Sequence, residues 1–381
     1  MSNLSSTSAA ELASGVYDIS QPELFGAFIR KRKEFSQNKN DRSKAYGEVG
    51  SRLINVSDAF GVCVKGDGVY KNELFLIFRG STKRNFGADW VSNARAGLNT
   101  SQSGSLVHTG FNHIFTSMIA QLSRFLDESR SAHTVHCIGH SLGGAVANIA
   151  ADWIADRYNF AVKLYTFGAP RVGLGHGGFA SKLTTKLLPE NIYRVFHSTD
   201  PVPMAPLYPF MHAPVSGQAY YIPFSGLTIN ISAHSMENYI QSVSGHAWGA
   251  LYQPAPSFSP AAIKQWLEGN SENNPHSISF WNKLHYAIMH IVQKVLSIAG
   301  VAFSSAMTIA DHIAMILQKG VNLSGEIASW VFLFARKIMR ALSMRVVETI
   351  EELTIQMLRL LLNKLTRRIA EQAARALDSL L

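Results

Sequence analysis

A serine in a glycine-rich turn is the first candidate for chemistry in this chain. Residues 139–144 read GHSLGG, so Ser141 fits the pattern G-x-S-x-G, which places a nucleophilic serine on a tight turn between a strand and a helix. The apolar run HTVHCI precedes this turn and the helix-like run AVANIAADWIA follows it. The flanks therefore match the required context, although the pentapeptide alone is also compatible with an ordinary turn serine.

A serine hydroxyl is a weak nucleophile and needs a base, usually histidine, that is oriented by a carboxylate. In α/β-hydrolases the acid and then the histidine follow the serine along the chain. Asp200 in VFHSTDPVP and His234 in SAHSMENY meet this order. The alternatives are that Asp200 only caps a turn and that another histidine is the base. The other histidines considered after the serine are His197, His212 and His246.

Six stretches in order make the sequence resemble the class 3 lipases, the fungal-lipase type of α/β-hydrolase. The resemblance covers residues 55–245 and implies Ser141 as nucleophile, Asp200 as orienting acid and His234 as base. It also implies that Ser81 and the backbone N–H of Leu142 form the oxyanion hole. The stretches are LIFRGST (76–82), VHTGF (107–111), GHSLGGA (139–145), YTFGAPRVG (165–173), VFHSTDPVP (195–203) and HSMENY (234–239).

The same resemblance implies a lid helix over residues 81–94, in which Phe86 and Trp90 face lipid when the lid opens. The expected serine chemistry needs no cofactor, and no metal site is predicted. Secreted fungal members carry a signal peptide and disulfides, and this chain shows neither. The family has no matched counterpart for residues 280–381.

Two other patterns are not interpreted as sites. GLGHGG (173–178) fits a dinucleotide-binding pattern, but its place in the chain is already explained by the APRVG stretch. His133, His136 and His140 suggest metal ligands, yet no carboxylate or cysteine pattern completes a zinc site. The short basic runs RKRKEF and KRNF are expected to be solvated faces, so no nucleic acid partner is predicted.

The elements that position these residues change character near residue 280. Before it, short apolar runs alternate with helical patterns, which indicates a mainly parallel sheet covered on both faces. After it the pattern is almost wholly helical, with glycines dividing residues 280–345 into three helices and an uninterrupted helix over 346–381. We therefore predict an α/β-hydrolase domain over residues 1–270 and an all-α region over residues 280–381.

The composition suits a folded protein with anionic partners. Of 381 residues 47% are hydrophobic and 16% charged, and the net charge is +9, which favours a membrane surface, nucleic acid or an acidic protein. The helical region carries 12 Lys/Arg against 7 Asp/Glu. Its amphipathic helices either lie at an anionic membrane surface or bury one another in a bundle or a self-association interface.

The sequence leaves two possibilities open for the localisation of the protein. The N-terminus MSNLSSTSAAELASG has neither a basic nor an apolar signal region, and no uncharged apolar stretch reaches about 18 residues. We expect a cytoplasmic protein or one exported by a signal-independent route, with peripheral membrane association. Cys63 and Cys137 lie in apolar runs and are expected to be buried thiols.

The activity expected from these observations is hydrolysis of lipid carboxylic esters through an acyl-enzyme. Phospholipid is favoured over neutral fat because the net charge and the basic helical region suit anionic bilayers. Three alternatives stay open. They are an inactive hydrolase fold that binds a membrane or a partner protein, an acyltransferase, and an exported toxin or effector lipase.

Overall fold

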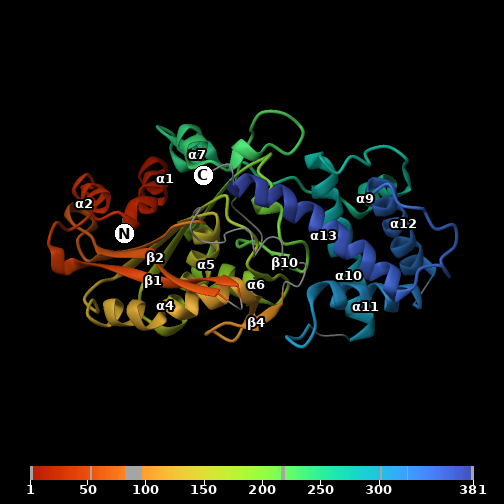
Figure 1. Ribbon diagram of the computed structural model, residues 1–381, viewed down its shortest axis with the longest axis horizontal. Coiled ribbons are helices and arrows are strands. Elements are labelled where there is room, and N and C mark those ends of the chain that lie inside the picture. Colours follow the sequence, from red (N-terminus) through yellow and green to blue (C-terminus); the bar gives the residue numbers. More distant parts are fainter. Residues whose placement is uncertain are drawn as a thin grey trace.

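A twisted sheet forms the centre of the first part of the chain (Figure 1). The computed structural model describes residues 3–51, 54–81, 97–215, 219–300, 303–323 and 325–378. Within them the main sheet has the strand order β1-β2-β3-β6-β7-β9-β11, in which β3 to β11 are mutually parallel and β1 and β2 are antiparallel. The strands are β1 (Arg42–Ser51), β2 (Ile54–Lys65), β3 (Glu73–Phe78), β6 (Thr134–His140), β7 (Ala161–Phe167), β9 (Ile192–His197) and β11 (Tyr220–Ile222).

The central strands are buried on both faces, which explains their continuous apolar sequences. In β3, Leu74 and Leu76 point into one apolar cluster, whereas Phe75 and Ile77 point into another, as the alternation of side chains along a strand requires. One face is covered by α4 (Thr109–Asp127), α5 (Leu142–Arg157) and α6 (Phe179–Leu187). The opposite face is covered by α1 (Ser6–Gly15), α2 (Pro22–Arg30) and α7 (Met236–Val243), as Figure 1 shows.

The structure also contains a second, smaller sheet of four short strands. Its order is β10-β8-β5-β4, and its paired strands are antiparallel. The strands are β4 (Leu98–Thr100), β5 (Leu106–His108), β8 (Gly173–Leu174) and β10 (Phe210–Met211). Together the two sheets confirm the predicted α/β fold with a mainly parallel sheet, and Cys63 and Cys137 are buried free thiols, as expected.

The helical region after the hydrolase part is confirmed, and its helices share one apolar cluster. The cluster contains residues of α9 to α13, and α9, which lies within the predicted domain of residues 1–270, packs with α10 and α12. The division of the chain at residues 270–280 therefore stays a prediction. The helices are α9 (Pro260–Glu268), α10 (Ile278–Ala299), α11 (Ile309–Val321), α12 (Gly325–Ala341) and α13 (Ile355–Asp378).

The prediction of one helix over residues 346–381 is wrong at its start. Residues 346–354 form turns, and α13 begins only at Ile355. The Glu352 carboxylate accepts the backbone N–H groups of Glu348 and Thr349, at 3.1 Å each. The Thr354 hydroxyl accepts the N–H of Met357 at 3.3 Å. These side chains satisfy backbone groups in a non-helical conformation and cap the helix that follows.

None of the helices in the described ranges combines the length and the apolar character that crossing a membrane requires.

Candidate active site

The strand-to-helix turn at Ser141 is built as the motif predicts. Ser141 directly follows β6 and directly precedes α5, and its backbone has φ 55° and ψ −127°, a region that non-glycine residues seldom adopt. Neighbouring glycines permit the close approach of strand and helix. A Cβ at Gly139 would lie 2.3 Å from the Gly143 carbonyl oxygen, and one at Gly143 would lie 2.1 Å from the carbonyl oxygen of Phe78.

The structure brings Ser141, His234 and Asp200 into one hydrogen-bonded row. His234 Nε2 lies 2.8 Å from Ser141 Oγ, and His234 Nδ1 lies 2.8 Å from Asp200 Oδ2. The carboxylate only accepts, so Nδ1–H donates to it and Nε2 accepts from the serine hydroxyl. All three side chains are buried, with relative exposures of 0%, 0% and 1%. The order of atoms is that of a serine nucleophile, a base and an orienting acid.

A short 3-10 helix begins just after the acid, and another ends at the base. Asp200 follows β9 and precedes η5 (Val202–Met204), and its Oδ1 accepts the Val202 N–H at 2.9 Å. His234 is the last residue of η6 (Ile231–His234). The backbone N–H of Asn230, just before η6, donates to the Thr199 carbonyl at 3.0 Å. The two turns are therefore joined to each other beside the row.

The competing histidines lie in other contacts. His197 Nδ1 bonds to the Ala233 carbonyl at 2.6 Å, and its Nε2 lies 2.9 Å from Ser242 Oγ. His212 Nε2 donates to the Pro203 carbonyl at 2.8 Å. His246 is exposed. Of the four histidines compared, His234 is the one that contacts both Ser141 and Asp200.

Two tyrosines that the sequence did not indicate complete the surroundings of the row. Tyr239 Oη donates to Asp200 Oδ2 at 2.7 Å and accepts the His197 N–H at 3.1 Å. Burial, together with the adjacent carboxylate, raises the pKa of Tyr239 well above its usual value, so the hydroxyl stays a donor. Tyr239 is a buried residue of α7 within the HSMENY stretch, so its place in the same short motif as His234 could have indicated it.

Tyr17 acts through a histidine rather than directly. Its Oη lies 2.7 Å from His140 Nδ1, and His140 Nε2 lies 2.9 Å from the His234 carbonyl oxygen. Burial lowers the pKa of His140 well below its usual value. The neutral ring donates from Nε2 to the carbonyl and accepts from the Tyr17 hydroxyl at Nδ1. Nothing local in the sequence points to this contact, because Tyr17 is more than 100 residues from its partner.

Ser81 lies in the loop after β3, and Arg79 holds that loop in place. The buried Arg79 donates to Asp58 Oδ2 at 2.8 Å, to the Ala59 carbonyl at 2.7 Å and to the Gly80 carbonyl at 3.1 Å. A Cβ at Gly80 would lie 3.1 Å from Ser141 Cβ. The Gly80 backbone therefore passes directly beside the nucleophile.

The two predicted oxyanion donors are the sequence neighbours of the contact between Gly80 and Ser141: Ser81 follows Gly80, and Leu142 follows Ser141. Ser81 is 7% exposed, and its buried Oγ makes no hydrogen bond with the described residues. The N–H of Leu142 belongs to the first turn of α5, whose N–H groups have no intrahelical acceptor. The helix dipole adds partial positive charge at the same place. Phe86 and Trp90, the predicted lid residues, lie outside the described residues.

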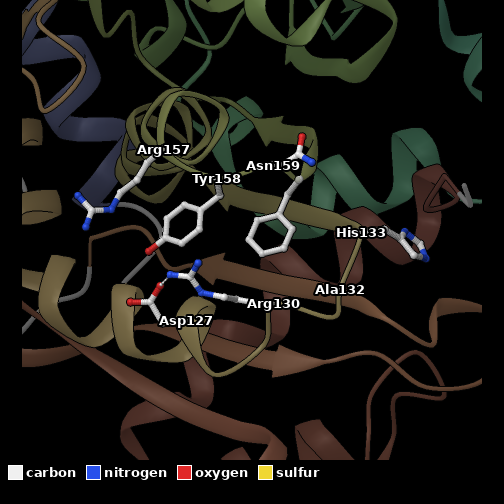
Figure 2. A pocket seen from close by; sticks show the side chains of 8 residues that line it. Asp127, Arg130, Ala132, His133, Arg157, Tyr158 and Asn159 are labelled. Carbon is white, nitrogen blue, oxygen red and sulfur yellow. Dashed lines mark hydrogen bonds and ion pairs between the residues drawn. The ribbon is translucent and has the colours of Figure 1, made fainter.

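A depression at the opposite end of the sheet does not share these features (Figure 2). It is lined by residues at the ends of α4 and α5 and before β6 and β7, among them Arg130, His133 and Arg157. Figure 2 shows Arg157 and His133 pointing away from one another. Arg130 is already paired with Asp127 at 2.8 Å. No nucleophile and base meet in its lining.

The other patterns weighed in the sequence also have ordinary structural partners. His136 Nε2 lies 2.5 Å from Glu73 Oε2, and His140 bonds as described above. Among the described residues no group of three His, Cys, Asp or Glu side chains could hold a metal ion. GLGHGG begins with β8 of the small antiparallel sheet, not with a strand of a parallel dinucleotide-binding unit.

Comparison with known proteins shows similarity to lipases over the part of the chain that holds Ser141 and Asp200. Residues 75–210 match the family model described as lipase (class 3). A "Secreted mono- and diacylglycerol lipase 1" of Fusarium solani is 35% identical over 164 residues, which are 42% of this chain and 46% of that protein. "Phospholipase A(1) DAD1, chloroplastic" of Arabidopsis thaliana is 28% identical over 162 residues, 36% of this chain and 34% of that protein.

A shorter match involves a bacterial toxin. "Toxin TseL" of Vibrio cholerae is 38% identical over 71 residues, which are 18% of this chain and 11% of that protein. The chain spans about half the length, or less, of the curated relatives that it matches.

Proposed function

We propose that the protein hydrolyses lipid carboxylic esters through a covalent acyl-enzyme, in agreement with the match of residues 75–210 to the class 3 lipase model. The observation that carries the proposal is the buried row Ser141–His234–Asp200, with both contacts at 2.8 Å. A base already in hydrogen-bond reach of the nucleophile, and itself oriented by a carboxylate, is what activates a serine hydroxyl.

In this mechanism Ser141 Oγ attacks the ester carbonyl carbon while its proton passes to His234 Nε2. Asp200 holds the ring and stabilises the imidazolium that forms. The C–O bond to the alcohol then breaks, and the alcohol leaves with the proton from Nε2. Water, deprotonated by the same nitrogen, attacks the acyl-enzyme and releases the fatty acid and free Ser141.

Ser81 Oγ and the Leu142 N–H are the proposed donors to the oxyanion of the two tetrahedral intermediates. Their support is geometric: Gly80 packs beside Ser141, and the Ser81 hydroxyl has no partner among the described residues. A donor that is free in the resting enzyme can bond to the charge that develops in the transition state, without first breaking another bond.

The proposed substrate is a phospholipid at a membrane surface. The net charge of +9 supports this proposal, as does the basic outer side of α13, where Lys364, Arg367 and Arg375 are exposed. Anionic lipid attracts such a surface. The similarity to a phospholipase A(1) agrees with this substrate. The similarity to a toxin agrees with a further proposal, that the protein is an exported effector lipase.

The test compares acyl release from phosphatidylglycerol vesicles, a triacylglycerol emulsion and a short p-nitrophenyl ester. Wild type is compared with Ser141→Ala and with Ser129→Ala, a control at another buried serine. Release from vesicles that disappears only in Ser141→Ala supports the whole proposal. Release from the emulsion or the short ester alone contradicts the phospholipid assignment. Absence of Ser141-dependent release from all three contradicts the enzymatic function and favours the inactive fold. Esters formed when an added alcohol replaces water would reveal an acyltransferase.

A further inference from the structure

The last helix belongs to both parts of the molecule. In Figure 1, α13 runs from the helical region back toward the hydrolase part. Leu358, Leu361 and Leu365 in its first half join the apolar cluster of the helical region. Four buried apolar side chains of its second half join the main hydrolase cluster, which also contains Leu142 and Val202. They are Ala370, Ala373, Ala376 and Leu377.

In the hydrolase part α13 contacts η5 and η6. These are the two short turns that begin just after Asp200 and end at His234. Neither turn is long enough to hold its own position, because a 3-10 helix of three or four residues has only one or two internal hydrogen bonds. Their position depends on what packs against them, and α13 packs against both.

Alanines occupy the buried side of α13 in its second half. Ala370, Ala373 and Ala376 are 3%, 0% and 0% exposed, and their spacing of three residues places them along one face of the helix. These alanines share an apolar cluster with Val202 of η5, and a methyl group lets the backbone of α13 approach that cluster more closely than a larger side chain would. Interiors packed to this degree transmit small displacements to their neighbours.

We infer that α13 is a positioning element of the active site, which holds the acid-bearing and base-bearing turns and so couples the helical region to the triad. The inference rests on the proposed hydrolysis. In this inference α13 supports η5, next to Asp200, and η6, which ends at His234. Displacing α13 therefore misaligns Asp200 and His234 and slows the chemical step, while binding of a small soluble ester changes little.

The experiment uses the full chain and three substitutions on neighbouring positions. Ala373→Leu keeps a strong helix former but forces the helix away from the turns. Ala373→Gly keeps the close approach but weakens the helix. Ala374→Leu adds the same side chain at the next, partly exposed position and is the matched control. The readouts are kcat and KM on a short p-nitrophenyl ester, with Tm for each variant.

We expect Ala373→Leu to lower kcat by about tenfold or more with KM within about twofold, since small misplacements of catalytic groups are costly. Ala373→Gly should keep most of the wild-type kcat although its Tm falls, and Ala374→Leu should match wild type. Equal losses of kcat in both Ala373 variants, in proportion to Tm, would mean that the position is merely structural. A higher kcat in Ala373→Leu would make α13 a cover over the site instead. Either result overturns the inference.

A second measurement does not depend on a variant that folds. Wild type is labelled at Ser141 with a p-nitrophenyl alkylphosphonate, which forms a P–O bond to Oγ and releases p-nitrophenol. If α13 and the active site are coupled, labelling the site should also stabilise the helix, because coupling is reciprocal. Compared with the unlabelled protein, amide hydrogen exchange should therefore become slower in residues 231–234 and also in residues 370–377. Unchanged exchange in α13 would overturn the inference. An enzyme inactive on all esters would overturn the proposed function as well, whereas an active wild type with silent Ala373 variants would overturn the role of α13 alone.

Discussion

Replacing Ser81 by alanine should slow catalysis and stabilise the resting protein at the same time. In the resting structure the Ser81 hydroxyl is buried and has no hydrogen-bond partner among the described residues. An unsatisfied buried polar group costs about 1–3 kcal/mol. Alanine removes that group without creating a large cavity, so the free energy of unfolding should stay the same or rise by about 1 kcal/mol.

The effect on the reaction has the opposite sign. Removing one oxyanion donor costs about 3 kcal/mol of transition-state stabilisation, which corresponds to a loss of about 100-fold in kcat. KM should change little, because the ground-state carbonyl carries much less charge than the oxyanion. The Leu142 N–H remains as the second donor, so activity should fall and not vanish.

The assay is steady-state hydrolysis of a soluble p-nitrophenyl ester, together with thermal unfolding. Ser105→Ala is the matched control, since Ser105 is also buried with an unpartnered hydroxyl and lies between β4 and β5 of the small sheet. It should raise Tm by a similar amount, about 1–3 °C, and leave kcat unchanged. A kcat for Ser81→Ala within threefold of wild type would refute the oxyanion role. A Tm that falls by several degrees would refute the unpaired state of the hydroxyl.

Two further substitutions test the surroundings of the site. Tyr239→Phe removes a donor to Asp200 and leaves the buried His197 N–H unpaired; we expect a loss of stability of about 1–3 kcal/mol and about tenfold in kcat, and an unchanged kcat would contradict the role of the tyrosine. Burial lowers the pKa of His108 to about 4. Between pH 6.5 and 4 the unfolded chain therefore binds more protons than the folded protein, and the free energy of unfolding decreases as the pH is lowered. His108→Asn can still accept the Gly110 N–H at the start of α4 but does not titrate. The Tm of wild type should therefore drop relative to that of His108→Asn as the pH falls through this range, and parallel curves would contradict the assignment.

The sequence by itself determined the parts of this protein that are written in local patterns. Continuous apolar runs such as ELFLIF and the G-x-S-x-G turn predicted buried parallel strands and a strand-to-helix turn, because period and turn chemistry are properties of adjacent residues. The chain order of serine, acid and histidine, together with the family resemblance, favoured Ser141, Asp200 and His234, although other histidines also follow the serine. The turns at residues 346–354 were missed because Glu352 and Thr354 bond to nearby backbone groups in competition with the helix.

Only the tertiary structure decided which distant groups touch. Tyr17 reaches His140, Arg79 pins the loop before Ser81, and α13 returns from the helical region to pack on η5 and η6. The tertiary structure also decided between His234 and His246, because both histidines follow the serine in the sequence and only their positions in the fold differ. Contacts of this kind depend on how the sheet and the helices pack, and a small shift of either would separate the atoms. Local propensity carries no information about such distances, because they are set by the closure of the whole core.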